Sequence, residues 1–293
     1  MSDFEAADRA AVLVEALPYI QRFRDAVVVV KYGGNAMSDE ATTRRLAEDI
    51  VLMRAVGLRP VLVHGGGPQI GEFTERLGMT PEFRDGLRVT DAETLEVARM
   101  VLVGKVNRDL VAALNVHGPV AVGVAGEDAG LIAAEPRDPS LGFVGDVSEV
   151  NPSVLHSLLS EELIPVVSTI GADAEGQAYN INADAVAGAL AAAIGATKLV
   201  YLTDVPGLLA DVEDPTSLIA RIGVADVEAM VSRGAIAGGM IPKIAACVDA
   251  VRAGVGSVHI LDGRRAHALL LELFTDAGVG TMIAYDRGAT DAL

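Results

Sequence analysis

The feature that most constrains this chain is a repeated alternation of short apolar runs with segments of helical periodicity. Residues 27–31 (VVVVK) and 60–64 (PVLVH) have the length and β-branched content of buried strands, and glycines and a helical pattern follow each of them. Strands separated by helices form βαβ units, in which helices cover both faces of parallel strands. The alternation therefore predicts an α/β fold, a three-layer αβα sandwich with a mainly parallel, open central sheet.

The same periodicities place the remaining elements along the chain. Strands are expected at residues 27–31, 60–64, 120–124, 164–168, 198–203, 257–261 and 281–284, and helices at residues 38–56, 68–77, 91–115, 183–194, 225–232, 240–253 and 266–274. Ser38 is expected to be the N-cap of the first of these helices. The polar stretches 138–145 and 173–182 are predicted to be hairpins or loops inserted between helical units.

Residues 1–25 precede the first expected strand and carry apolar side chains at helical spacing. These are Val12, Leu13, Ala16, Leu17 and Ile20. A helix outside the main sheet must bury such a stripe, either on its own subunit or on a partner subunit. With a candidate boundary near Ala196, the chain divides into a helical extension for oligomerisation (1–25), a first lobe (26–195) and a second lobe (196–293).

Charge excludes some classes of partner. The 293 residues include 23 Lys and Arg against 40 Asp and Glu, a formal net charge of -17. Nucleic-acid binding and attachment to anionic lipid both need clustered cations, so we predict no nucleic-acid partner and no membrane partner. The single cysteine, Cys247, excludes an intramolecular disulfide framework and is expected to be a small buried hydrophobe. Because we find no signal peptide and no apolar run of about 20 residues, we predict a cytoplasmic protein.

Two glycine-rich turns follow the first two expected strands and are the first candidates for chemistry. Lys31 precedes Gly33 and Gly34, which places a cation beside backbone N–H groups that can approach an anion closely. His64 precedes three glycines and a proline (65–68), a run that suits a carboxylate or phosphate at a helix N-terminus. Neither turn matches GxxxxGK[ST] or GxGxxG, so a plain βα turn is the alternative for each. His64 is expected to be a packed or hydrogen-bonded turn residue rather than a base.

Further polar residues lie at the ends of predicted elements. Arg88 is a candidate clamp for a carboxylate, with a surface residue ahead of an N-cap as the alternative. Asn180 and Asn182 alternate along an extended segment and face one side of it. Asp184 follows in the first turn of a helix, where capping alone would also explain it. Lys243 lies in the first turn of another helix, where a cation is unfavourable unless an anion binds there.

Taken in order, six segments resemble those of the N-acetyl-L-glutamate kinases, a branch of the amino acid kinase family. They are KYGGNAM, LVHGGGPQI, GLRVT, NINADAVA, LTDVPG and GGMIPK, within about residues 26–285. GLRVT and NINAD point to acetylglutamate rather than to the substrates of the carbamate, aspartate and UMP kinases, which share the fold. The resemblance implies an amino acid kinase-like fold and ATP-dependent phosphorylation of the side-chain carboxylate of N-acetyl-L-glutamate, in arginine biosynthesis.

The resemblance also implies roles for individual residues. Lys31 and Lys243 would be the catalytic lysines, and Asp184 would hold both in position. The implied substrate-binding residues are Gly66, Gly67, Arg88, Asn180 and Asn182. The implied ATP-binding residues are Gly33, Gly34, Thr203, Asp204, Gly238 and Gly239. ATP would bring Mg²⁺ held mainly by its own oxygens and water, so no metal-ligating residue is assigned. The lobe 26–195 would bind the amino-acid substrate and the lobe 196–293 the ATP.

The two ends of the chain resemble members of this family that are hexameric and inhibited by arginine. We therefore expect a homo-oligomer, either a dimer or a hexamer built as a trimer of dimers. The candidate effector residues are His267, Glu272, Gly278 and Gly280. Glu272 is the candidate partner of an arginine guanidinium, with an exposed helix residue as the alternative.

Other functions remain as alternatives. The nearest is another kinase of the family, acting on carbamate, aspartate or UMP. A nucleotide-binding dehydrogenase shares the βα alternation, although GxGxxG does not follow the first strand. A non-catalytic arginine sensor with the same fold is less consistent with the presence of Lys31, Lys243 and Asp184.

Overall fold

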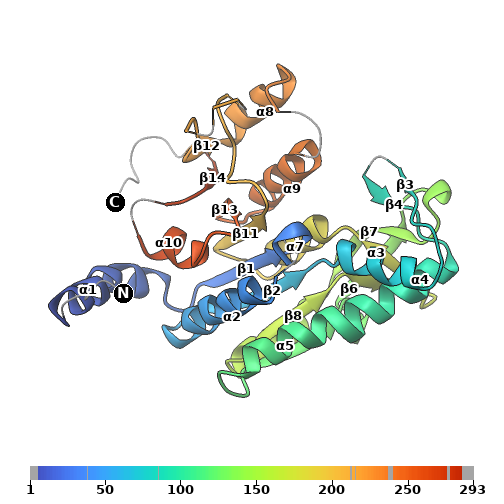
Figure 1. The fold of residues 1–293 in the computed structure, drawn as a ribbon, viewed down its shortest axis with the longest axis horizontal. Coiled ribbons are helices and arrows are strands. Elements are labelled where there is room, and N and C mark those ends of the chain that lie inside the picture. Colours follow the sequence, from blue (N-terminus) through green and yellow to red (C-terminus); the bar gives the residue numbers. More distant parts are fainter. Residues whose placement is uncertain are drawn as a thin grey trace.

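The computed structural model describes residues 6–37, 39–84, 86–211, 213–214, 216–236, 240–275 and 278–285. Its main sheet has eight strands in the order β12-β14-β13-β11-β1-β2-β8-β5. Figure 1 labels all of these strands except β5. Neighbouring strands are parallel except β13 and β14, which are antiparallel. The strands are β1 Val27–Tyr32, β2 Arg59–His64, β5 Ala121–Ala125, β8 Ile164–Ser168, β11 Lys198–Thr203, β12 Arg221–Gly223, β13 Ser257–Asp262 and β14 Thr281–Ala284.

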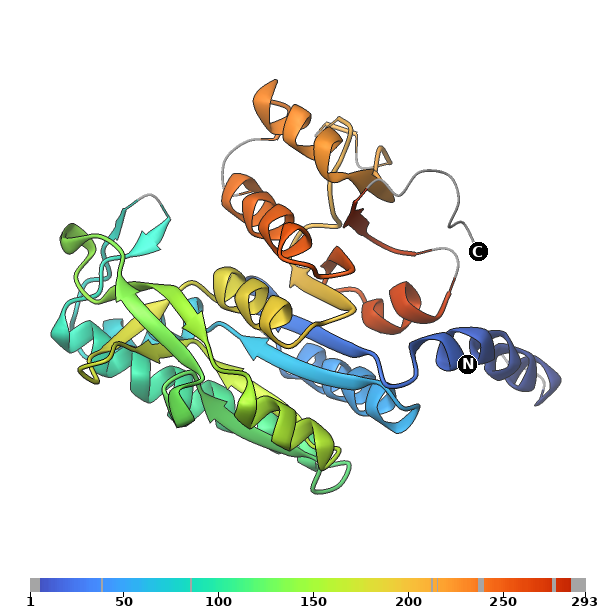
Figure 2. The same ribbon diagram turned by 180° about the vertical axis from the view of Figure 1, so that it is seen from behind.

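Helices cover both faces of this sheet, which confirms the predicted α/β fold. They are α1 Ala6–Phe23, α2 Glu40–Ala55, α3 Gly67–Arg76, α4 Ala92–Arg99, α5 Asn107–Asn115, α6 Ser153–Ser160, α7 Ala183–Ala193, α8 Val224–Ser232, α9 Met240–Arg252 and α10 Ala268–Phe274. Successive residues of β1 point to opposite faces, because side chains alternate along a strand. Val28 and Val30 pack in the core that includes Ile50 of α2, whereas Val29 packs in the core that includes Leu190 of α7. Figures 1 and 2 show the two helical layers from opposite sides.

A smaller sheet and a hairpin are attached to the main sheet. The smaller sheet consists of β6 Ile132–Pro136, β7 Val144–Val150, β9 Ile170–Ala172 and β10 Ala178–Ile181, and the hairpin of β3 Phe83–Arg84 and β4 Leu87–Arg88. The predicted hairpins or loops at 138–145 and 173–182 are turns of this smaller sheet, and the second of them carries β10. The sequence did not predict β6, β7 or α6. Polar residues break the apolar pattern of β7 (VGDVSEV), and α6 is only eight residues long.

Several predicted boundaries need correction. Helix α2 begins at Glu40, and its N-cap is Asp39, whose carboxylate accepts the N–H groups of Ala41 and Thr42. The prediction of Ser38 as N-cap is therefore wrong, and Ser38 itself lies outside the described residues. Strand 281–284 was expected to close the sheet, but β12 lies beyond it.

The predicted helix 91–115 is continuous but not uniform. It begins after Asp91, whose side chain caps it, and it changes to a π-helical turn at η2 Met100–Val106 before it continues as α5. Such π turns occur frequently at functional sites. In this molecule the turn packs against the beginning of α3.

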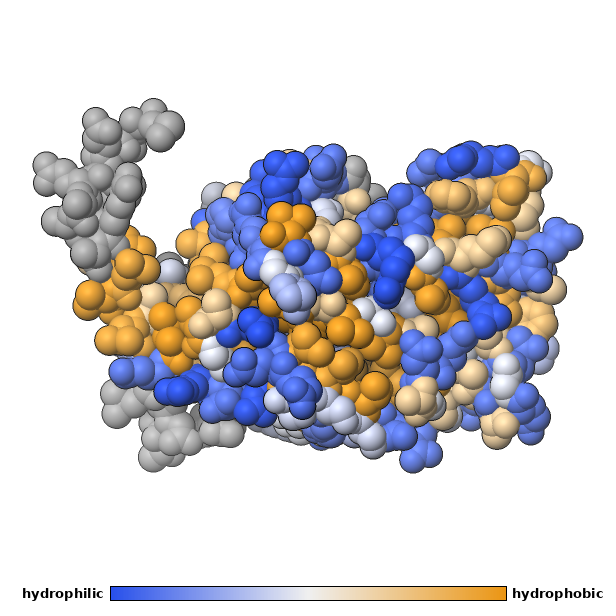
Figure 3. Space-filling model, turned by 90° about the horizontal axis from the view of Figure 1, so that it is seen from below, coloured by the Kyte–Doolittle hydropathy of each residue, from blue (hydrophilic) through white to orange (hydrophobic). Residues whose placement is uncertain are grey.

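Helix α1 confirms the expected N-terminal helix and leaves much of its apolar stripe in solvent. Val12, Leu13 and Leu17 are 57%, 73% and 48% exposed. Apolar side chains at this end of the molecule are visible in Figure 3. Cys247 lies fully buried on α9, as predicted. No helix within the described residues is long and apolar enough to cross a membrane.

Candidate active site

The candidate site lies where the parallel strands of the main sheet end, which is the edge at which α/β sheets bind ligands. A cleft of about 250 Å³ opens there, beside the ends of β1 and β2. The predicted site residues that line this cleft are Lys31, Gly34, Gly66, Gly67, Arg88, Asn180, Asn182 and Asp184. Segments far apart in the sequence therefore meet in one cavity.

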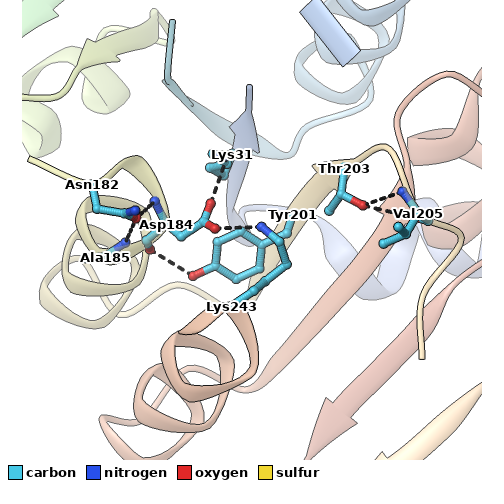
Figure 4. A network of polar contacts seen from close by, with 8 residues as sticks. All are labelled: Lys31, Asn182, Asp184, Ala185, Tyr201, Thr203, Val205 and Lys243. Carbon is cyan, nitrogen blue, oxygen red and sulfur yellow. Dashed lines mark hydrogen bonds and ion pairs between the residues drawn. The ribbon is translucent and has the colours of Figure 1, made fainter. Parts of the chain in front are cut away.

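At one end of the cleft, one carboxylate binds two ammonium groups. Lys31 Nζ, from β1, lies 2.8 Å from Asp184 Oδ1, and Lys243 Nζ, from the first turn of α9, lies 2.6 Å from Asp184 Oδ2. Figure 4 shows Asp184, at the start of α7, between the two lysines. Burial raises the pKa of this carboxyl group, but the two cations outweigh burial and hold the pKa below its usual value. Asp184 is therefore ionised at neutral pH.

Tyr201 supports this ion cluster from β11, and sequence analysis did not single it out. Its hydroxyl donates to the backbone carbonyl of Asp184 at 3.0 Å, and its ring centroid lies 5.4 Å from Lys243 Nζ. It therefore fixes the start of α7 and offers its ring face to a cation. A polar-tipped aromatic residue inside an apolar strand (KLVYLT) was the signal available in the sequence.

Gly33 leaves room for the Lys31 ammonium. A Cβ atom at this position would lie 2.9 Å from Lys31 Nζ, closer than real Cβ contacts occur. A larger residue here would push the Lys31 ammonium away from this position, in which it contacts Asp184.

Arg88, on β4, also lines the cleft and is 8% exposed. Its Nη2 donates to the carbonyl of Gly67 at 2.9 Å, and its guanidinium lies 4.7 Å from the ring centroid of Phe83. Nη1 is buried and has no hydrogen-bond partner in the described part of the chain. An unpartnered buried donor is costly, and a bound carboxylate or phosphate would satisfy it.

The two asparagines are held differently. Asn180 Nδ2 donates to Thr90 Oγ1 at 3.4 Å. The side-chain oxygen of Asn182 accepts the N–H groups of Asp184 and Ala185 at 2.8 and 3.3 Å and so caps α7. Asn182 lines the cleft, but its oxygen already has a structural role.

The predicted nucleotide-binding residues are only partly described. Thr203 and Asp204 do not line the cleft, and the Thr203 hydroxyl is engaged by the backbone of Val205. Figure 4 shows Thr203 and Val205 on the side of Lys243 away from Asn182. Gly238 and Gly239 lie outside the described residues.

Three of the four candidate effector residues come together. Glu272 Oε2 accepts the N–H groups of Val279 and Gly280 at 2.7 and 3.3 Å, and Gly278 lies beside the same carboxylate. Glu272 is therefore not an exposed helix residue. His267 is separate: its Nδ1 lies 2.6 Å from Asp49 Oδ1 of α2.

Two residues of the Glu272 cluster were missed by sequence analysis. His259 Nδ1 lies 2.6 Å from Glu272 Oε1, and its Nε2 lies 3.0 Å from Lys198 Nζ. Burial raises the pKa of Glu272, but His259 and the backbone donors outweigh burial and lower it; burial lowers the pKa of Lys198 to about 8. A histidine inside an apolar strand (SVHIL) was the signal in the sequence.

Comparison with known proteins agrees with this geometry. The model of the amino acid kinase family matches residues 26–262. The acetylglutamate kinase of Acaryochloris marina is 54% identical over 281 residues, which cover 96% of this chain and 99% of that protein. The acetylglutamate kinase of Saccharopolyspora erythraea is also 54% identical, over 95% of this chain and 93% of that protein.

The chain belongs to the amino acid kinase family, in its acetylglutamate kinase branch.

Solved structures support the same fold. The N-acetylglutamate synthase of Neisseria gonorrhoeae, complexed with coenzyme A and N-acetyl-glutamate, superposes with a TM-score of 0.83 at 29% identity, covering 95% of this chain and 64% of the synthase. The carbamate kinase of Giardia lamblia bound to AMP-PNP superposes with a TM-score of 0.67 at 20% identity, over 89% of this chain and 99% of that one. The prediction of an enzyme of the kinase class is confirmed, and the dehydrogenase alternative loses its support.

Proposed function

We propose that the protein transfers the γ-phosphoryl group of ATP to the side-chain carboxylate of N-acetyl-L-glutamate, giving N-acetyl-L-glutamyl 5-phosphate and ADP, as a cytoplasmic step of arginine biosynthesis. The observation that carries this proposal is the Lys31–Asp184–Lys243 ion cluster at the end of a cleft with a free Arg88 donor. The high identity to acetylglutamate kinases supports the choice of substrate.

The chemistry suits these residues. A glutamate-type carboxyl group has a pKa of about 4.3, so the nucleophile is already ionised at pH 7 and needs no general base. Phosphoryl transfer then needs in-line positioning and neutralisation of charge on the γ-phosphoryl oxygens. In this proposal Lys31 and Lys243 supply the positive charge, and Asp184 keeps the two ammonium groups close together before ATP arrives.

We assign the substrates to the two lobes predicted above. Arg88, Asn180 and the N–H groups of Gly66 and Gly67 hold acetylglutamate in the lobe 26–195. The turn that contains Gly33 and Gly34 contacts the phosphates, while Thr203, Asp204, Gly238 and Gly239 line the nucleotide site in the lobe 196–293. Among the described residues, no group of three or more His, Cys, Asp or Glu could hold a metal ion. Mg²⁺ usually keeps several waters and binds substrate phosphates, so we assign it to the oxygens of ATP and to water.

The test is ADP release by the purified protein in ATP and Mg²⁺, with and without N-acetyl-L-glutamate. We expect acetylglutamate to stimulate release, and glutamate, aspartate, carbamate and UMP to fail as acceptors. Phosphorylation of one of those four compounds in its place would reassign the enzyme within the family. A lack of nicotinamide binding would remove the dehydrogenase alternative.

We also propose that arginine inhibits the enzyme at the Glu272 cluster. Glu272 is an ionised carboxylate beside Gly278 and Gly280, which suits a guanidinium ligand. The synthase of Neisseria gonorrhoeae has also been solved with L-arginine, at a TM-score of 0.81 over 94% of this chain and 65% of the synthase. We expect arginine to raise the acetylglutamate requirement of the wild-type enzyme and to lose this effect in Glu272→Gln.

The exposed stripe of α1 supports an assembly of several subunits. We propose that α1 joins dimers into a hexamer, because Val12, Leu13 and Leu17 have no cover in the described chain. Deleting residues 1–20 should leave a dimer that arginine no longer inhibits. A truncated protein that remains hexameric by light scattering would refute this assignment.

A further inference from the structure

His64 is a buried titratable residue that the proposed chemistry does not use. It ends β2, is 0% exposed, and directly precedes the glycine run. Its Nδ1 lies 2.9 Å from the carbonyl oxygen of Gly65, and its Nε2 lies 3.1 Å from Asn107 Nδ2. The imidazole therefore connects the glycine turn to the start of α5.

The hydrogen bonds around Asn107 determine which ring nitrogen carries the proton. Asn107 Nδ2 also donates to the carbonyl of Val166 at 2.8 Å, and Arg108 donates to Asn107 Oδ1. A carbonyl can only accept and a guanidinium can only donate, so the orientation of the Asn107 amide is fixed. His64 Nε2 must then accept from Asn107, and the proton of the neutral ring lies on Nδ1 and is donated to Gly65.

This donation orients the next peptide group. A trans peptide is planar, so its C=O and N–H point in opposite directions. Holding the Gly65 carbonyl toward His64 turns the Gly66 N–H away from the ring. Within the described residues, the N–H groups of Gly66 and Gly67 find no backbone acceptor. A glycine peptide rotates easily, so an external contact is needed to keep it in one orientation.

The helix that supplies Asn107 also contacts the turn at a second point. A Cβ atom at Gly66 would lie 2.6 Å from Leu102 Cδ2 and 3.4 Å from Val106 Cγ2, both in the π turn η2. Gly66 is therefore pressed against η2, while Asn107, the residue after it, holds His64. One helix fixes both the position and the rotation of the turn.

We propose that His64, kept in one tautomer by Asn107, is a positioning residue that locks the Gly65–Gly66 peptide so that the Gly66 N–H faces an anionic substrate. The proposal rests on the proposed function for the identity of that substrate, the carboxylate of acetylglutamate. It assigns His64 no proton transfer: burial, helped by the nearby Arg108 cation, lowers its pKa to about 4 although the hydrogen bond to Gly65 opposes this shift. The ring stays neutral at the working pH.

Two substitutions separate positioning from packing. In His64→Asn the amide nitrogen occupies the place of Nδ1 and can still donate to Gly65. In His64→Gln the longer side chain can still accept from Asn107 but cannot reach the Gly65 carbonyl. We expect KM for acetylglutamate to stay within about threefold of wild type in His64→Asn and to rise about 10- to 100-fold in His64→Gln, with KM for ATP little changed. His117→Asn, at an exposed histidine, is the matched control.

Equal KM values for acetylglutamate in the two His64 variants would overturn the proposal. This holds if both values are normal, and also if both are raised and both variants lose thermal stability. A rise only in His64→Asn would also overturn it, since Asn107 rather than Gly65 would then be the important partner. These comparisons are made only if the wild type releases ADP in response to acetylglutamate, so failure of the proposed function is recognised separately.

The tautomer of His64 can be measured directly on the wild-type protein. This measurement needs neither a substrate nor a variant. In a long-range ¹H–¹⁵N spectrum of histidine-labelled protein, we expect His64 to show a protonated Nδ1 and an unprotonated Nε2 from pH 5 to pH 8. A proton on Nε2, or titration of the ring in this range, would overturn the proposal independently of activity.

Discussion

Burial raises the pKa of two largely buried carboxyl groups of this molecule, yet their net pKa shifts have opposite directions. Asp184 faces two lysines, and its pKa lies below the usual value. Asp49 of α2 is 3% exposed and faces His267, and burial, helped by Glu48, raises its pKa to about 6 although the imidazole opposes this shift. The difference shows that burial alone opposes ionisation and that permanent cations reverse this, whereas one half-exposed imidazole does not.

The comparison also separates a functional site from a structural contact. Asp184 holds charges from β1 and α9 beside a cleft, while Asp49 joins α2 to the start of α10. The effects of substitution should therefore fall on catalysis at the first site and on stability at the second. The four predictions below test this division, beginning with the largest expected effect.

Removing a lysine should abolish most catalysis and leave the fold intact. Lys243→Ala or Lys31→Ala removes a cation from the transferring phosphoryl group, and we expect kcat to fall about 10²- to 10³-fold. ADP release measures kcat, and circular dichroism checks the fold. Lys105→Ala is the control, because Lys105 is exposed and pairs with Asp109 away from this cluster. Near-wild-type turnover in either lysine variant would contradict the assignment.

Neutralising Asp184 should be nearly as harmful. Asp184→Asn keeps the shape but leaves two ammonium groups unneutralised, so the lysines should separate and kcat should fall on the order of 10²-fold. The measurement is ADP release at saturating substrates. In the double variant with Lys243→Ala, additive losses of catalytic free energy would show that the two residues act independently. That result would contradict the ion pair between them.

Replacing Asp49 should change stability rather than turnover. The pKa of Asp49 is higher in the folded than in the unfolded protein. Its contribution to the free energy of unfolding is therefore most favourable below about pH 4 and is lost as pH rises through about 6. Asp49→Asn should therefore gain about 1–2 kcal/mol relative to wild type between pH 4 and pH 7. Urea unfolding of both proteins at several pH values measures this difference. A difference that does not vary with pH would contradict the raised pKa.

The smallest effect is expected at His267. The imidazole lowers the pKa of Asp49, so removing it should move the Asp49 transition to higher pH. His267→Asn suits the left-handed backbone at this position, where φ is 55°. We expect less than about 1 kcal/mol of destabilisation at pH 8, because His267 is half exposed. The same urea series, compared with Asp49→Asn, shows whether the pH at which Asp49 loses its stabilising effect rises or stays the same in His267→Asn.

The sequence predicted those features that depend on local pattern. The β1 and β2 strands and the α7 and α9 helices have strong periodicity, and their ends carry Lys31, His64, Asp184 and Lys243. The sequence therefore indicated which residues would gather at one edge of the sheet. The roles implied for individual residues came from the family resemblance and remain proposals.

Other features depend on contacts that no local pattern encodes. The π turn at η2 has the same apolar spacing as an ordinary helix, so nothing in the sequence marked Asn107 as the partner of His64. Likewise, His267 was grouped with Glu272 because both lie in the C-terminal segment that resembles arginine-inhibited members of the family. The left-handed backbone at His267 turns its ring to α2 instead.

The buried position of Cys247 makes it a natural reporter of motion. It is the only cysteine of the chain, lies on the helix that carries Lys243, and burial raises the pKa of its thiol far above the usual range. A thiol reagent can react with it only when α9 separates from the core, so the alkylation rate measures how often that helix opens. A change in that rate on adding nucleotide would show, without any label, whether ATP holds the helix closed.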